Sequence, residues 1–131
     1  MAPKLVSTNI VEYQSKEHME LSIYRTENAL KETIEKMKAN GLHRLTVSQI
    51  WNKASSFKLC FNWEYLDEKS FIKCQEILNQ KLAETDRLPV KLSTHRGIIL
   101  FDFTSAIKDL PLTGFVIFTK DFLFRLLWKI F

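Results

Sequence analysis

Hydrophobic residues recur at helical spacing over residues 15–40. The positions that share one helix face, separated by three, four or seven residues, are Met19, Ile23, Leu30, Ile34 and Met37. Asn40-Gly41 is a typical left-handed stop for a helix. The pattern therefore predicts one long helix over residues 15–40. Leu21 and Tyr24 lie off its main face, and we expect them to contact a partner.

Two capping patterns predict further helices. Thr46 with Gln49 three positions later has the form of a capping box and predicts a short helix over residues 46–54. Residues 55–66 then form an aromatic connection. Asp67 is a good N-cap for a third helix over residues 68–84. Its expected core positions are Phe71, Cys74, Ile77, Leu78 and Leu82.

After Pro89 the pattern changes to that of β-structure. Residues 90–94 alternate apolar and polar side chains, and residues 98–103 are rich in β-forming types. Gly97 lies between them and suits a left-handed turn position. We therefore expect a β-hairpin over residues 90–103.

The last stretch is unusually apolar. We expect a strand over residues 115–118 and a helix over 119–131, whose surface is apolar nearly all round. Such a helix closes the core, docks on a second copy or another protein, or lies on a membrane, of which the membrane surface is the least favoured. The residues predicted to contact a partner are Phe122, Phe124, Trp128 and Phe131.

This order of elements, three helices followed by a hairpin, resembles a winged helix-turn-helix. Residues 36–51 look like its first helix, short first strand and second helix, residues 68–84 like its recognition helix, and residues 90–103 like its wing. The resemblance implies an α+β, winged-helix-like domain over residues 15–110. A loose N-terminal lead over residues 1–14 precedes it, and an apolar segment over residues 111–131 follows.

Charge qualifies the function that this resemblance implies. The 131-residue chain carries 19 basic and 15 acidic residues, and most of its net charge of +4 lies after residue 90. A winged helix binds nucleic acid through cations, and the candidates are Lys69, Lys73, Lys91, His95 and Arg96. Glu76 and Glu84 share the outward face of the third helix and oppose tight binding. We therefore expect weak DNA or RNA binding through the wing, or, as an alternative, a pure protein-interaction subunit.

Candidate chemistry adds no catalytic or metal site. The histidines His18, His43 and His95 are scattered, and no metal-ligand spacing or glycine-rich phosphate loop occurs. We expect no enzyme, no cofactor and no small-molecule substrate. Cys60 and Cys74 lie among apolar residues, as reduced thiols do, and no apolar signal segment begins the chain. An intracellular protein of the nucleus or cytoplasm, with a protein partner or a second copy, is the expectation.

Overall fold

The computed structural model describes residues 2–51 and 56–105. The described elements, in chain order, are β1 (Leu5–Tyr13), α1 (Lys16–Glu27), α2 (Lys31–Ala39), β2 (Leu42–Gln49), β3 (Lys58–Tyr65), α3 (Glu68–Ala83) and β4 (Val90–Ile98). By its internal contacts the chain divides into Met1–Leu100 and Phe101–Phe131, and the fold described here is that of the first unit.

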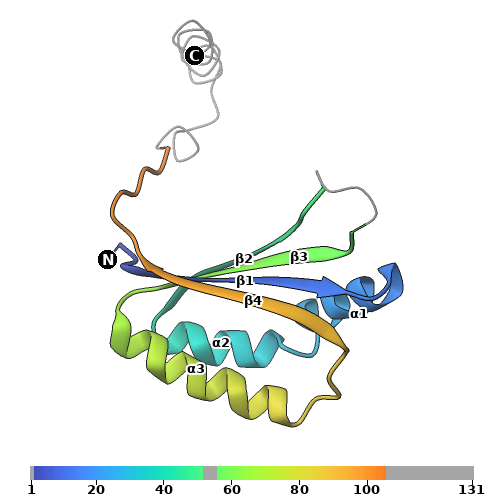
Figure 1. The fold of residues 1–131 in the computed structure, drawn as a ribbon. Helices are drawn as coiled ribbons and strands as arrows, with labels where there is room; N and C mark the ends of the chain where they lie inside the picture. The colour runs from blue at the N-terminus through green and yellow to red at the C-terminus, as the bar shows by residue number, and fades with distance from the viewer. Residues whose placement is uncertain (1, 52–55, 106–131) are drawn as a thin grey trace, which may run out of the picture. The chain divides into compact units, whose positions relative to one another are not determined.

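The four strands form one antiparallel sheet in the order β2-β3-β1-β4. All three helices lie on the same face of this sheet (Figure 1). The order of strands and helices, with the first helix split into α1 and α2, is that of the ferredoxin-like α+β fold.

The core forms where alternate strand residues meet the helices. Leu59, Trp63 and Tyr65 of β3 are all buried on the helix-facing side. Met37 of α2 and Cys74 and Leu78 of α3 pack with Trp63 and Tyr65. A second cluster joins Tyr13, Met19 and Leu59. Because side chains alternate along a strand, the other residues of these strands lie on the face that no helix covers.

The predicted long helix over residues 15–40 is two helices. Ser15 caps α1, since its Oγ accepts a hydrogen bond from the His18 N–H at 3.2 Å. At Asn28 the backbone N–H and the side-chain amide both donate to the Tyr24 carbonyl, at 3.0 and 2.8 Å. The Leu30 N–H then donates to the Arg25 carbonyl at 2.9 Å, five residues back, so the four-residue helical spacing is lost. The helix therefore ends at Glu27 and a new helix begins at Lys31.

The winged-helix prediction is wrong because three segments form strands of the central sheet. Residues predicted as the short helix 46–54 contribute to β2, whose residues Leu45 and Val47 pair with β3. The aromatic connection 55–66 contains β3 itself. The predicted loose lead, residues 1–14, contains β1 in the middle of the sheet. Strand pairing over a long sequence separation outweighed the local helix signal at residues 46–54, and it ordered the other two segments, for which neither a helix nor a strand was predicted.

The predicted wing is also wrong. Residues 90–98 are a single strand that pairs with β1 along its whole length, and Gly97 lies in that strand opposite Val6. Gly97 does not turn the chain, because its φ is not positive.

Two local predictions are confirmed. The third helix begins after Asp67, whose Oδ1 accepts from the Ser70 N–H at 2.7 Å. Gly41 follows α2 with φ +105°, as expected for a left-handed stop. The predictions for residues 115–131 lie outside the described residues, including the contacts of Phe122, Phe124, Trp128 and Phe131.

Candidate functional site on strand β4

Strand β4 is an edge of the sheet, and its outer edge pairs with no other described strand. The Ile99 N–H donates to the Lys4 carbonyl at 2.9 Å, so the odd-numbered residues of β4 direct their backbone polar groups toward β1. The N–H and C=O groups of Leu92, Thr94 and Arg96 therefore point outward. They are free to pair with another strand.

The helix-facing side of β4 is largely uncovered. Val90 is 41% exposed, Leu92 63% and Ile98 74%. Helix α3 packs against β2 and β3, and α1 packs against β1. The strand therefore exposes apolar side chains on the sheet face that elsewhere forms the core.

Polar residues form a block on this same face, where β1 and β4 run side by side. Ser7 pairs with Arg96 and Asn9 pairs with Thr94. Ser7 is 5% exposed, so its hydroxyl group is enclosed by the core around it. A serine, an asparagine, a threonine and an arginine on the core-facing side of a sheet are unusual, because this side normally buries apolar groups.

Arg96 is held in place by an aromatic ring. Its guanidinium carbon lies 5.0 Å from the centroid of Phe71, in the first turns of α3. This cation–π contact places the charge at the boundary between sheet and helix. Burial raises the pKa of Tyr65 well above its ordinary value, although the positive charge of Arg96 acts in the opposite direction. Tyr65 is therefore a neutral phenol near physiological pH and does not neutralise Arg96.

Trp63 continues the row of Arg96 and Ser7 on the next strand, since Ser7 also pairs with Trp63. The Trp63 side chain is 5% exposed, and its indole nitrogen has no hydrogen-bond partner among the described residues. A buried N–H without an acceptor costs about 1–3 kcal/mol. This N–H lies within the core cluster and is closed to solvent.

The opposite face of β4 carries two of the predicted nucleic-acid residues, Lys91 and His95. His95 Nε2 lies 3.0 Å from Ser93 Oγ. Two residues of β1 lie on the same face. The Thr8 hydroxyl donates to Asn62 Oδ1 at 2.7 Å, and Glu12 Oε2 lies 3.9 Å from Lys58 Nζ. Register places no Phe, Tyr or Trp on this face of the described strands. The stacking platform with which sheet surfaces bind single-stranded nucleic acid is therefore missing.

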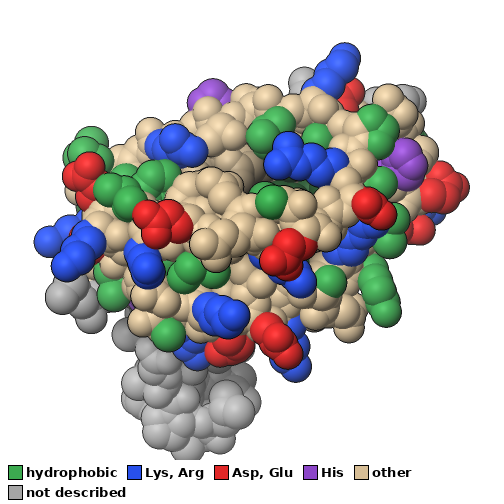
Figure 2. Space-filling model, turned by 90° about the horizontal axis from the view of Figure 1, so that it is seen from below, with side chains coloured by type: hydrophobic (Ala, Val, Ile, Leu, Met, Phe, Trp, Pro, Cys, Tyr) green, Lys and Arg blue, Asp and Glu red, His purple; other side chains and the backbone are tan. Residues whose placement is uncertain are grey.

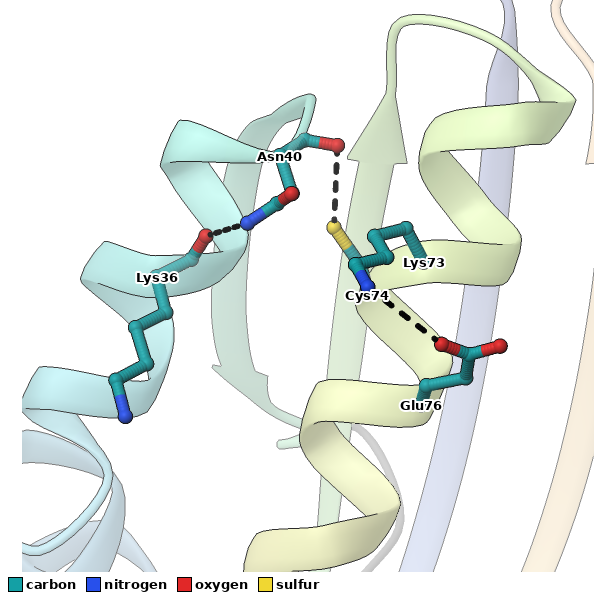
Figure 3. Close-up of polar contacts among 5 residues, drawn as sticks. All are labelled: Lys36, Asn40, Lys73, Cys74 and Glu76. Carbon is teal, nitrogen blue, oxygen red and sulfur yellow. Dashed lines mark hydrogen bonds and ion pairs between the residues drawn. The ribbon is translucent and has the colours of Figure 1, made fainter.

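Lys69 and Lys73, the other predicted nucleic-acid residues, lie on α3, away from β4. They border a shallow depression that also contains Asp67, Glu68 and Glu76. Figure 3 shows Lys73 paired with Glu76, at 3.9 Å, beside the contact of Cys74 Sγ with the Asn40 carbonyl at 3.7 Å. On the helix-covered side as a whole, basic and acidic side chains are interspersed (Figure 2). No basic patch of the kind that follows a phosphate backbone forms among these described residues.

Leu21 and Tyr24 are exposed on α1, and their predicted role in partner binding stays a prediction. Lys91, His95 and Arg96 were predicted on or beside the tip of a wing, whereas the structure places them on one strand, with Arg96 on the helix-facing side and the other two on the opposite face. It missed Ser7, Asn9 and Thr94. No local pattern marked them, because residues 5–13 carry apolar side chains at both parities, with Val6 and Ile10 opposite in parity to Leu5.

Within residues 2–51 and 56–105, no three His, Cys, Asp or Glu side chains gather as a metal site. Over the same residues, none of the helices combines the length and the apolar character needed to cross a membrane.

Comparison with known sequences gives one family. The sequence profile of DUF6974, a domain of unknown function, matches residues 2–99. No curated protein sequence matches the chain.

Comparison with solved structures agrees on the fold. A dimeric ferredoxin-like protein from an uncultured marine organism is 23% identical with a TM-score of 0.67, over 78% of this chain and 100% of that one. A second such protein, also from an uncultured marine organism, is 19% identical with a TM-score of 0.70, over 78% and 99%. A monooxygenase from Streptomyces coelicolor, in complex with nanaomycin D, is 8% identical with a TM-score of 0.58, over 79% and 93%.

These similarities establish a ferredoxin-like fold. The function predicted from the winged-helix resemblance, nucleic-acid binding through a wing, is therefore wrong: its recognition helix and wing do not exist as such in this fold.

Proposed function

Because the chain belongs to DUF6974, a family of unknown function, we propose a function from its geometry: it is a non-catalytic, homodimeric module that assembles through strand β4. The observation that carries this proposal is the regular outer edge of β4. Of the two edge strands, β2 contains an irregularity between Leu42 and Arg44, whereas β4 keeps one register with β1 from Val90 to Ile98. Irregular edges resist pairing with other chains, and long regular ones invite it.

A second copy of the chain is the proposed partner of this edge. The exposed apolar residues lie near both ends of β4, with Val90 and Leu92 at one end and Ile98 at the other. In an antiparallel pair related by a two-fold axis, the Val90 end of one strand lies beside the Ile98 end of the other, so these residues cover one another. Two structurally similar proteins are themselves dimeric, which supports this choice of partner.

The absence of catalysis is part of the proposal. Ser93 Oγ lies 3.0 Å from His95 Nε2. Among the described contacts, this one most resembles a nucleophile with its base. Both residues are exposed on an edge strand. Activating a serine requires a base that is itself held in position by a third group in a shielded site. In an exposed pair of this kind the serine hydroxyl is not activated as a nucleophile.

The test is the mass of the full chain in solution, measured by size-exclusion chromatography with light scattering. We expect twice the 15.4 kDa of one chain. Thr94→Pro removes an outward-pointing N–H and leaves the pairing with β1 intact, because the residue is in an extended edge position. Both strands of the two-fold dimer carry the substitution, so each dimer loses this hydrogen bond twice. We therefore expect the dimer dissociation constant to rise by roughly tenfold or more.

Gln49→Pro is the matched control. The Ile50 N–H donates to the Lys58 carbonyl, so Gln49 points its own N–H outward from β2, the opposite edge of the sheet. We expect this variant to stay dimeric. Should Thr94→Pro unfold the chain, as circular dichroism would report, Leu92→Lys replaces it, since an exposed side chain tolerates lysine. A monomeric wild type, or a dimer that withstands Thr94→Pro or Leu92→Lys in folded protein, refutes the proposal.

A further inference from the structure

We infer that Ser7, Asn9, Thr94 and Arg96 form a binding site for the carboxylate group of a small organic acid. This site lies on the helix-facing side of β4, beside the proposed dimer contact, and shares Leu92 with it. The apolar part of the ligand lies against Phe71 and Leu92.

The first argument is the composition of the block. Register places Ser7 beside Arg96 and Asn9 beside Thr94, so four polar side chains occupy neighbouring positions on one face. The surrounding positions of the same face, Leu5, Val11 and Leu92, are apolar. Ser7 is buried there, whereas Thr94 and Arg96 are exposed, so the block joins an enclosed hydroxyl to an accessible cation, an arrangement that suits a ligand.

The second argument is the state of Arg96. Among the described residues, no carboxylate lies within the 4.0 Å ion-pair distance of its guanidinium. Its guanidinium carbon lies 5.0 Å from the Phe71 ring centroid, and because Arg96 is exposed, its N–H groups are accessible to a ligand. A planar fork of donors matches the two oxygens of a carboxylate.

The third argument is the supply of further donors. Trp63 lies next to Ser7 in the same cross-strand row, but its indole N–H is buried in the core, so it reports on the site and is not counted as a donor. The hydroxyl groups of Ser7 and Thr94 and the amide of Asn9 donate as well as accept. A row of donors ending in one cation suits a singly charged acid.

Carboxylate is favoured over phosphate by the charge of the block. Arg96 is its one cation, and Lys91 of the same strand lies on the opposite face. A doubly charged phosphate is usually bound by several cations or by a helix N-terminus, whereas one arginine with neutral donors balances one negative charge. The exposed Leu92 and the ring of Phe71 supply apolar surface for the rest of the molecule.

The experiment is a titration of the full, ¹⁵N-labelled chain with sodium benzoate, followed by NMR. Benzoate is a minimal probe, for which a dissociation constant of about millimolar is expected from its size. We expect the indole N–H signal of Trp63 and the amide signals of Ser7 and Arg96 to shift with one common binding curve. The indole signal of Trp51, which is exposed at the surface, is the internal reference.

Two controls separate recognition of the carboxylate from unspecific contact. Benzamide has the same shape without the charge and is expected to bind at least roughly tenfold more weakly, as is benzoate to Arg96→Gln. Lys91→Gln removes an equal charge from the opposite face of β4, and we expect benzoate to bind it within about twofold of wild type. If Arg96→Gln does not fold, Arg96→Lys keeps the charge but lacks the fork, and we expect an intermediate loss.

The inference is overturned if benzoate leaves the Trp63 and Arg96 signals unchanged up to about 50 mM, well above the expected constant. It is equally overturned if benzamide binds as well as benzoate, or if Lys91→Gln weakens binding as much as Arg96→Gln. None of these results bears on the dimer, which is measured by mass.

Discussion

Replacing Gly41 by alanine tests how tightly the end of α2 is packed against α3. Gly41 has φ +105°, in the left-handed region that side chains other than glycine rarely adopt. A Cβ atom built on Gly41 would overlap both Oγ and Cβ of Ser70 and would lie 3.4 Å from Ser70 Cα. The hydroxyl can rotate away, but the Cβ of Ser70 is fixed by the helix backbone.

The expected cost follows from these two effects. The left-handed conformation costs alanine about 1 kcal/mol relative to glycine. Overlap with a helix Cβ forces α2 and α3 apart, and overpacking of this kind costs about 1–3 kcal/mol. We therefore expect Gly41→Ala to lower the free energy of unfolding by about 3 kcal/mol.

The assay is urea denaturation monitored by circular dichroism, in a double-mutant cycle with Ser70. In a Ser70→Gly background the overlapping atoms are gone, so the cost of Gly41→Ala should fall to about 1 kcal/mol. In a Ser70→Ala background the Cβ overlap remains, and most of the cost should persist. Equal costs of Gly41→Ala in the Ser70→Gly and wild-type backgrounds would refute the reasoning from overlap.

Two further predictions concern Asp67 and Ser93. The Ser70 backbone N–H holds the pKa of Asp67 below its ordinary value of 3.8, so the contribution of its ionised form is complete above that pH and is lost as the pH falls through the lowered pKa. The Tm of wild type should exceed that of Asp67→Ala at pH 7 and converge toward it in acid, whereas a constant difference down to pH 2 would contradict this ionic cap. For the non-catalytic proposal, Ser93→Ala should hydrolyse p-nitrophenyl acetate at the wild-type rate, and a loss of tenfold or more would assign the Ser93–His95 pair a catalytic role.

Helix α3 and the stop after α2 were predictable because their signals are local. Asp67 accepts a hydrogen bond from a residue three positions away, and Gly41 adopts its φ within the turn itself. The apolar spacing of Phe71, Cys74 and Leu78 also matches the face that α3 buries. Such features depend on neighbours in sequence, which the sequence displays directly.

The strands were misinterpreted because a strand is stabilised by residues far along the chain. Thr46 and Gln49 fit a capping box, yet Thr46 pairs with Asn62 and Gln49 with Leu59. Residues 58–65 alternate in the way a strand does, with Leu59 and Trp63 buried. That alternation is hidden by apolar or aromatic residues at both parities, such as Cys60 beside Phe61.

The candidate site, like the fold, was predictable only where its features depend on neighbours in sequence. The sequence by itself determined that Arg96 is a cation in a β-forming segment and that the chain belongs to the α+β class. Only the tertiary structure decided which face of the sheet Arg96 occupies and that Ser7 lies beside it, 89 positions earlier in the chain. A side chain's face follows from strand register, and register is set by pairing between distant segments, whose partners a local pattern does not specify.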